Sequence, residues 1–258
     1  IFFEFVMNNL PIPTPEAQAH SQQLQKAIVE EILAAGGWMS FARFMEQLLY
    51  APGLGYYTAG ARKFGAAGDF VTAPELTALF GQALARQVAQ VMANSAPVVL
   101  EVGAGSGRLA ADLLLSLEQM ECLPERYFIL DLSADLRQRQ EQHIAAAAPH
   151  LLARVAWLDR LPEEFSGVVV ANELLDAMPA YILAWREDGI YERGVSCDAG
   201  GGFTWNERPA TGALRQAAEE IGAQCNLPPG FESEISLAVR AWSAEWGHRL
   251  KKGALLLI

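Results

Sequence analysis

Three alternating glycines, Gly103, Gly105 and Gly107, follow directly on the strand-like run PVVLEV. The helix-forming run RLAADLLLSLEQ begins at the next residue. A buried parallel strand, a glycine turn and a helix N-terminus together form the nucleotide-cradling corner of an open α/β sheet. The third glycine of a dinucleotide fingerprint would fall on Arg108. G-x-G-x-G after a strand with the acid Glu101 is instead the arrangement used for S-adenosylmethionine (SAM); the alternative is an ordinary glycine-rich turn.

The ends of the next two predicted strands supply acids that suit a nucleoside. In such a sheet the ligand lies at the carboxyl ends of the strands. The run YFILD ends in Asp131, which could accept both ribose hydroxyls or could be a helix N-terminal acid beside Ser133. The run VAWLD ends in Asp159, which could accept a bond from the adenine amino group or be a plain loop acid. The glycine turn itself favours the carboxylate of a methionine moiety.

A fourth apolar run, GVVVANELLDAMP, delivers Asn172, Glu173 and Asp176 to the same edge. Carboxylates are useful there if the methyl acceptor is an arginine, because a guanidinium stays protonated in water. Anions would orient its fork, hold its charge and take up the released proton. Glu173 and Asp176 would share one face of a helix. The alternative is a solvated first helical turn capped by Asn172.

Strands that alternate with helices should position these residues. Strands are expected at 97–102, 127–131, 154–158 and 167–171, with helices at 107–119 and 133–146. This alternation predicts right-handed βαβ units and a parallel sheet.

The segments on either side of this pattern are of a different kind. The first 96 residues predict helices from Thr14-Pro15 to Ala35, over 40–50 and from Pro74 to about Ala93. Asp188-Gly189 signals a hairpin within 180–207. Helices at 211–224 and 233–251 should follow. The run GALLLI then stops with no closing element, which predicts a chain truncated inside a sheet strand.

Composition narrows the class of protein. The 258 residues are 52% hydrophobic with a net charge of −11, a poor balance for nucleic-acid binding, which needs a basic footprint. The three cysteines are far apart in the sequence, so we expect no disulfide framework, no metal site and a reducing compartment. No run is long enough to span a membrane. The N-terminal IFFEFVMNN lacks the basic region of a signal peptide, and a cytoplasmic location is expected.

Five segments in order resemble the MidA-type SAM-dependent methyltransferases, which include a mitochondrial protein arginine methyltransferase needed for respiratory complex I assembly. The segments are FARFMEQLLYAPGLGYYTAG (41–60), GDFVTAPEL (68–76), LEVGAGSGRLAADLL (100–114), ANELLDAMP (171–179) and FESEISLAVRAW (231–242). The resemblance implies that the three glycines lie against SAM and Asp131 on its ribose. It also implies that four residues of GDFVTAPE fold over the cofactor or the acceptor channel: Asp69, Thr72, Pro74 and Glu75.

Two departures from the family pattern are visible. Leu174 and Leu175 stand where an aromatic residue often precedes the acid. Family members also continue beyond GALLLI, so the closing hairpin of the sheet is expected to be missing.

The resemblance implies an α/β fold of the class I SAM-methyltransferase (Rossmann-like) type. We expect a helical N-terminal region over 1–96 and a core over 97–258, with an insertion at about 180–232 and an incomplete C-terminus. The expected activity is SAM-dependent methylation of arginine in a partner protein, and the resemblance implies a complex I subunit as a candidate partner. One alternative is a SAM-binding assembly factor that acts by docking, and a second is a nicotinamide dehydrogenase on a similar sheet.

Overall fold

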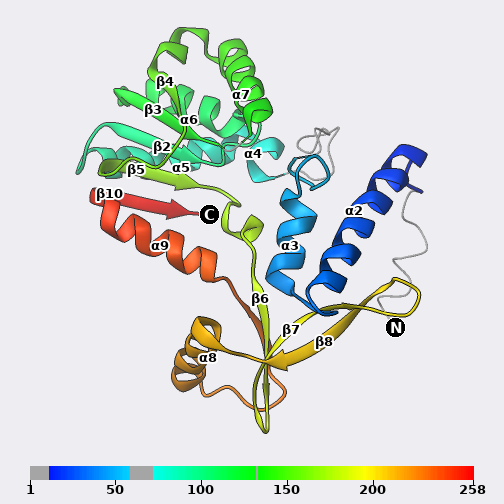
Figure 1. Cartoon of the computed structure of the whole chain (residues 1–258). Helices are drawn as coiled ribbons and strands as arrows, with labels where there is room; N and C mark the ends of the chain where they lie inside the picture. Colours follow the sequence, from blue (N-terminus) through cyan, green and yellow to red (C-terminus); the bar gives the residue numbers. More distant parts are fainter. Residues whose placement is uncertain (1–11, 59–71, 132) are drawn as a thin grey trace. The chain divides into compact units, whose positions relative to one another are not determined.

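The computed structural model describes most of the chain, namely residues 12–58, 72–131 and 133–258. These residues form two compact units (Figure 1). Among the described residues, unit 1 combines 12–58 with 179–237, and unit 2 combines 72–131 and 133–178 with 238–258. This division differs from the expected boundary at residue 96. The inserted segment groups with the N-terminal helices, whereas the helix before the glycine turn belongs to unit 2.

Unit 2 contains a five-stranded parallel sheet with the order β10-β5-β2-β3-β4. Its strands are β2 (Val98–Val102), β3 (Arg126–Leu130), β4 (Val155–Leu158), β5 (Phe165–Ala171) and β10 (Leu250–Leu257). In Figure 1, β10 in red lies beside β5 in yellow-green. The four strands expected from the sequence are confirmed within one or two residues at each end. Because all five are parallel, their carboxyl ends meet at one edge.

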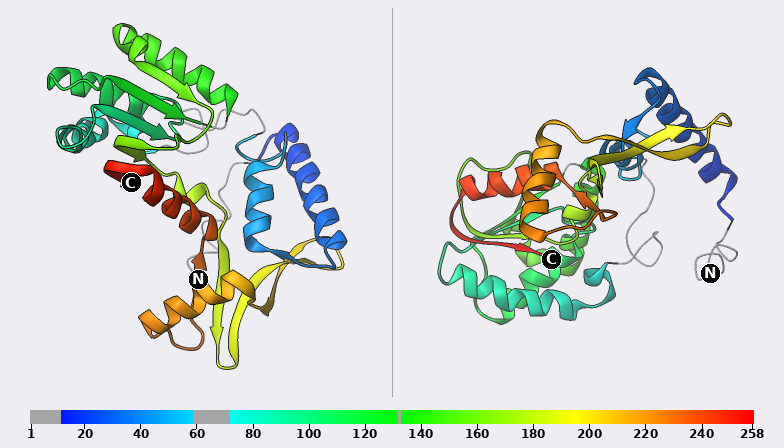
Figure 2. Two further views of the ribbon diagram at one scale, coloured as in Figure 1. Left: turned by 60° about the vertical axis from the view of Figure 1, so that its left-hand side comes forward. Right: turned by 90° about the horizontal axis from the view of Figure 1, so that it is seen from below.

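Both faces of this sheet are buried, as the near-continuous apolar strands require. The helical elements of unit 2 are α4 (Ala73–Leu76), α5 (Ala78–Met92), α6 (Arg108–Gln119), α7 (Ala134–Ala147), η2 (Pro149–Arg154), η3 (Leu175–Ala177) and α9 (Leu237–Arg249). Helices α5, α6 and α7 pack on one face, around Val99 and Ile129. Helix α9 lies on the other face (Figure 2). It packs there through Trp246, which is 1% exposed.

The sequence predicts one helix from Pro74 to Ala93, but the structure has two, α4 and α5, so the prediction of a continuous helix is wrong. Thr77 adopts an extended conformation, with φ −161° and ψ 141°, and breaks the chain between α4 and α5. Its hydroxyl accepts a hydrogen bond from the Leu79 N–H at 3.2 Å and so begins α5 as an N-cap. The apolar periodicity continues across the break, which is why the pattern did not signal it.

Unit 1 is built on an antiparallel sheet with the order β1-β7-β6-β9, and β8 also pairs with β7. Its elements are α2 (Pro15–Ala34), β1 (Met39–Ser40), α3 (Phe41–Tyr50), β6 (Tyr181–Arg186), β7 (Gly189–Cys197), β8 (Phe203–Pro209), α8 (Gly212–Cys225) and β9 (Glu232–Ile235). The predicted cap of the first helix is confirmed, because the Thr14 hydroxyl accepts from the Ala17 N–H at 3.2 Å. The predicted hairpin turn lies between β6 and β7.

The helix expected over 233–251 begins later than predicted. Residues 232–235 form β9, which pairs antiparallel with β6 from Tyr181 to Ala184. The first three residues of the segment ESEI are exposed, and the segment has no strong strand signal of its own. Its conformation is therefore set by pairing with a strand that is distant in the sequence. Within the described residues, no helix combines the length and hydropathy that crossing a bilayer needs.

Candidate functional site

The glycine turn lies at the carboxyl edge of the sheet in unit 2, between β2 and α6. Gly103, Gly105 and Gly107 have φ angles of +74°, +54° and +83°, which L side chains rarely adopt. The Gly103 N–H donates to Leu130 O at 2.9 Å and so ties the turn to the end of β3. Helix α6 begins at the next residue, Arg108, so its N-terminal N–H groups open on this edge.

The three glycines differ in what surrounds them. A Cβ on Gly103 would lie 2.9 Å from Leu174 Cδ1, and one on Gly107 would lie 2.8 Å from Gln140 Cα. A Cβ on Gly105 would meet no atom of the described residues within 4 Å. Packing against the backbone of α7 therefore explains glycine at the third position, whereas at Gly103 the close atom is the end of a flexible side chain and the positive φ is the reason for glycine. The backbone of Gly105 borders space that a ligand could enter.

Asp131 follows β3 at the same edge and is 9% exposed. Its Oδ1 accepts a hydrogen bond from the Ser133 N–H at 3.0 Å, and its Oδ2 accepts one from Gln140 Nε2 at 2.9 Å. The N-cap of α7 is Ser133, whose hydroxyl accepts from the Leu136 N–H. Asp131 is thus not the capping residue, and a carboxylate can accept more than two hydrogen bonds in total.

Gln140 was not foreseen from the sequence. Its side chain is completely buried on α7 and also donates to Gly105 O at 3.1 Å. The one available signal is its place four residues before the buried Ile144 on the same helix face. That spacing marks a buried position and says nothing about partners.

The Glu101 side chain lies in the core, on the sheet face that packs against α5, α6 and α7. It is 2% exposed and accepts a hydrogen bond from Tyr127 Oη at 2.5 Å. Burial is the main cause that raises the pKa of Glu101 to about 7, with the charge of Asp131 adding to the effect and the Tyr127 bond opposing it. Burial also raises the pKa of Tyr127 well above its ordinary value. The predicted contact between Glu101 and a cofactor stays a prediction.

The segment predicted to fold over the cofactor is described from Thr72 onward, and Asp69 lies outside the described residues. Thr72 is the N-cap of α4, and Pro74 is buried. Glu75 Oε1 accepts a short hydrogen bond from Ser106 Oγ, within the glycine turn. The structure therefore brings α4 to the turn, through a serine that the sequence analysis did not single out.

Asp159 follows β4 with its side chain 89% exposed, and it pairs with Arg137 NH1 at 2.6 Å. Arg137 also donates to the backbone carbonyls of Asp131 and Leu158, at 3.0 and 2.6 Å. This arginine on α7 joins the ends of β3 and β4, and so brings the two predicted acids to one place. Its role was not foreseen either. The adenine contact of Asp159 stays a prediction.

The third group of predicted residues follows β5. Asn172 Oδ1 is buried and has no hydrogen-bond partner among the described residues. Glu173 has φ +47°, a left-handed conformation uncommon for residues other than glycine and often found at functional sites. Its N–H donates to Ile258 O at 2.8 Å, which fixes it against the end of β10.

The local conformation differs from the helical turn considered for this segment. Residues 175–177 form a single 3-10 turn, η3, whose N-cap is Leu174, so Asn172 does not cap it. The carboxylates of Glu173 and Asp176 are both exposed. Two exposed carboxylates, and one amide oxygen with no hydrogen-bond partner in the described part of the chain, thus lie at the carboxyl end of β5.

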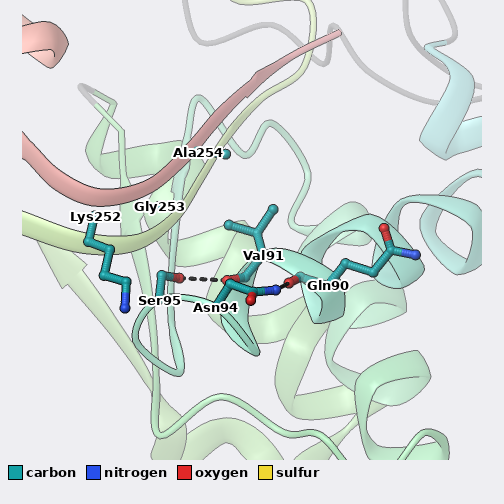
Figure 3. A pocket seen from close by; sticks show the side chains of 7 residues that line it. All are labelled: Gln90, Val91, Asn94, Ser95, Lys252, Gly253 and Ala254. Atoms are coloured by element: carbon teal, nitrogen blue, oxygen red, sulfur yellow. Dashed lines mark hydrogen bonds between the residues drawn. The ribbon is translucent and has the colours of Figure 1, made fainter.

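A hollow of about 430 Å³ lies elsewhere in unit 2 and is shown in Figure 3. It is lined by the end of α5 and the first half of β10: Gln90, Val91, Asn94, Ser95, Lys252, Gly253 and Ala254. These β10 residues pair with the start of β5, so the hollow lies toward the amino ends of the strands. Its lining includes none of the predicted site residues.

The strand order, the glycine turn and the acid after β3 define a class I SAM-methyltransferase fold. Residues 82–258 match the family described as "putative S-adenosyl-L-methionine-dependent methyltransferase". The chain belongs to this family, and the resemblance predicted from its motifs is confirmed.

Two kinds of relative support the assignment. A crystal structure from Burkholderia thailandensis, bound to S-adenosyl-homocysteine, is 45% identical with a TM-score of 0.87 and covers 96% of this chain and 65% of that one. The Caenorhabditis elegans protein arginine methyltransferase NDUFAF7 homolog, mitochondrial, is 29% identical over 65% of this chain and 44% of its own length. The Danio rerio protein arginine methyltransferase NDUFAF7, mitochondrial, is 28% identical over 69% and 49%. The chain spans about half the length of these curated relatives.

Proposed function

We propose that the protein binds SAM at the carboxyl edge of the unit 2 sheet and transfers its methyl group to an arginine of a partner protein. The observation that carries this proposal is that no atom of the described residues lies within 4 Å of a Cβ on Gly105, on the same edge as the hydrogen-bonded carboxylate of Asp131. The bound S-adenosyl-homocysteine of the Burkholderia thailandensis relative supports the choice of ligand. A nicotinamide cofactor has no comparable support.

The residues present fit this cofactor. N–H groups of the glycine turn and of the first turn of α6 suit the methionine carboxylate. Asp131 would accept from the ribose hydroxyls, and Asp159 from the adenine amino group. The Glu75–Ser106 contact supports a place for Thr72, Pro74 and Glu75 along one wall of the site. When bound, SAM supplies a methyl group attached to a sulfonium sulfur. That sulfur is the leaving group and becomes a neutral thioether when the methyl group is transferred.

The acids after β5 would act on the acceptor. An arginine guanidinium is protonated at neutral pH, and the exposed carboxylates of Glu173 and Asp176 can hold its fork and accept the proton that leaves on methylation. The unpaired Oδ1 of Asn172 offers a further acceptor for an N–H group. The contribution of these residues would be alignment of the nitrogen with the methyl carbon, which can remove several kcal/mol from a barrier.

The choice of a protein arginine rests on the curated relatives, which are named protein arginine methyltransferases. The proposal that the partner is a subunit of respiratory complex I rests on the family resemblance alone. A cytoplasmic location is likewise a proposal, supported by the bacterial structural relative and the free thiols of the three cysteines.

Methyl transfer from labelled SAM to arginine peptides of candidate partners tests the activity. The double variant Glu173→Gln/Asp176→Asn should lose at least about a hundredfold in rate if the two carboxylates orient and deprotonate the acceptor. Glu163→Gln, an exposed acid before β5, is the matched control and should leave the rate unchanged. Rates near wild type in the double variant would contradict the role of these acids.

A SAM-binding assembly factor is the second candidate, because the exposed carboxylates could equally dock a basic surface of a partner. This candidate function predicts that the protein binds SAM and a partner but transfers no label from SAM to any peptide. Turnover on any partner-derived peptide would exclude it.

A further inference from the structure

We propose that Gln140 is the positioning residue of the cofactor site, which locks the glycine turn to the ribose-binding acid. The inference rests on the proposed SAM site and adds a residue that does not itself touch the ligand. Gln140 comes from the middle of α7, and its side chain is completely buried. Burial of a polar side chain costs free energy unless its hydrogen bonds are made, so buried polar groups in proteins are nearly always hydrogen-bonded.

The orientation of the Gln140 amide is fixed by Trp157 on β4. Trp157 Nε1 donates to Gln140 Oε1 at 2.9 Å. An indole N–H can only donate, so the amide oxygen must face the tryptophan and the amide nitrogen must face the other way. The reversed amide would set two N–H groups against each other.

The two N–H groups of Nε2 are then aimed at the site. One donates to Gly105 O at 3.1 Å and the other to Asp131 Oδ2 at 2.9 Å. The amide oxygen of Gln140 and both N–H groups of its Nε2 thus each make a hydrogen bond. One side chain links the loop after β2 with the end of β3, the two strand ends that a nucleoside would bridge.

A further contact fixes the same residue through its backbone. Gly107 approaches Gln140 so closely that a Cβ on the glycine would lie 2.8 Å from Gln140 Cα. The turn therefore rests on the backbone of α7, while the side chain of Gln140 holds its middle residue, Gly105. The turn and Asp131 thus share Gln140 as a common neighbour.

The consequence for binding is a preset carboxylate. Asp131 Oδ1 is held by the Ser133 N–H and Oδ2 by Gln140, so rotation of the carboxyl group is blocked from both sides. A carboxylate has about four lone-pair positions, so it can accept from the two adjacent hydroxyls of a ribose in addition to such supporting bonds. Preorganisation of this kind lowers the entropy cost of binding. Without Gln140 the carboxylate could rotate, and the selectivity for a ribose diol should fall.

The test is calorimetric binding of two probes: S-adenosyl-homocysteine and its analogue that lacks both ribose hydroxyls. The variant Gln140→Met keeps the side-chain volume and removes all three hydrogen bonds. Gln142→Met, an exposed glutamine on the same helix, is the matched control. Trp157→Phe is a second variant, which leaves Gln140 in place but removes the bond that orients its amide.

We expect wild type and Gln142→Met to prefer S-adenosyl-homocysteine over the analogue by at least about tenfold. Gln140→Met should reduce this preference to about twofold, and Trp157→Phe should reduce it partly, with thermal unfolding used to verify that each variant is folded. An equal loss of affinity for both probes, with the preference unchanged, would mean a merely structural role and would overturn the inference. Failure of the wild-type chain to bind either probe would instead overturn the proposed function, and this inference with it.

Discussion

Replacing Glu101 by glutamine should remove a pH dependence from the stability of unit 2. The Glu101 carboxyl is buried in the core and accepts a hydrogen bond from Tyr127. Burial penalises its ionised form and raises its pKa to about 7. Glutamine has nearly the same shape, offers the same acceptor oxygen to Tyr127 and never ionises. Glu101→Gln therefore imitates the protonated residue at every pH.

The sign and size of the effect follow from linkage between protonation and folding. The pKa of about 7 in the folded chain lies above the ordinary value of 4.5, so the folded state holds the proton more tightly. The stability from the neutral carboxyl is fully present below about pH 4.5 and is lost as the pH rises through 7. One pKa unit corresponds to about 1.4 kcal/mol. Wild type should thus lose about 3 kcal/mol relative to Glu101→Gln between pH 4.5 and pH 8.

Urea unfolding of both proteins across this pH range measures the difference directly. Glu141→Gln, an exposed acid on α7, is the control and should differ from wild type by a constant amount. Carbon NMR of the glutamate carboxyls provides a second measurement, in which one resonance should titrate near pH 7. A stability difference between wild type and Glu101→Gln that does not change with pH would refute the reasoning.

Three glycine variants give further predictions. Gly107→Ala should lower the free energy of unfolding by about 2–4 kcal/mol, from overpacking against Gln140 and an unfavourable φ, measured by urea unfolding. Gly105→Ala should cost only about 1 kcal/mol, because open space receives its methyl group, yet should weaken S-adenosyl-homocysteine binding in calorimetry. Gly253→Ala should destabilise unit 2 by more than about 2 kcal/mol in thermal unfolding, since its Cβ would lie 1.8 Å from Gly167 O in the paired strand β5. A Gly105→Ala variant less stable than Gly107→Ala would contradict the assignment of the open space.

Much of unit 2 could be predicted because its signals are local. Buried parallel strands are short apolar runs, and the glycines after β2 indicate a turn because glycine is typical of positions with positive φ. Thr14 and Pro15 fixed the start of α2 for a similar reason, since a cap depends on neighbouring residues. Elements that depend on distant partners were missed. β9 is a strand because β6 lies beside it, and its own residues are mostly polar and exposed.

The site divides in the same way. Asp131 could be expected at the edge of the sheet because it directly follows a strand. The groups that hold it could not, because Gln140 and Arg137 reach it from α7 through side chains whose partners no spacing rule specifies. The same holds for Ser106, which meets Glu75 only after α4 has folded onto the turn. Sequence patterns located the residues proposed to face the ligand, while the hydrogen bonds that support them needed the structure.

Calorimetric titration of SAM into the purified chain tests the central claim most directly. The structure predicts one bound SAM per chain and no binding heat with NAD. Asp131→Ala should weaken SAM binding by at least about tenfold, because it removes the proposed acceptor for the ribose hydroxyls. A wild-type chain that binds NAD, or that takes up no SAM at all, would contradict the account.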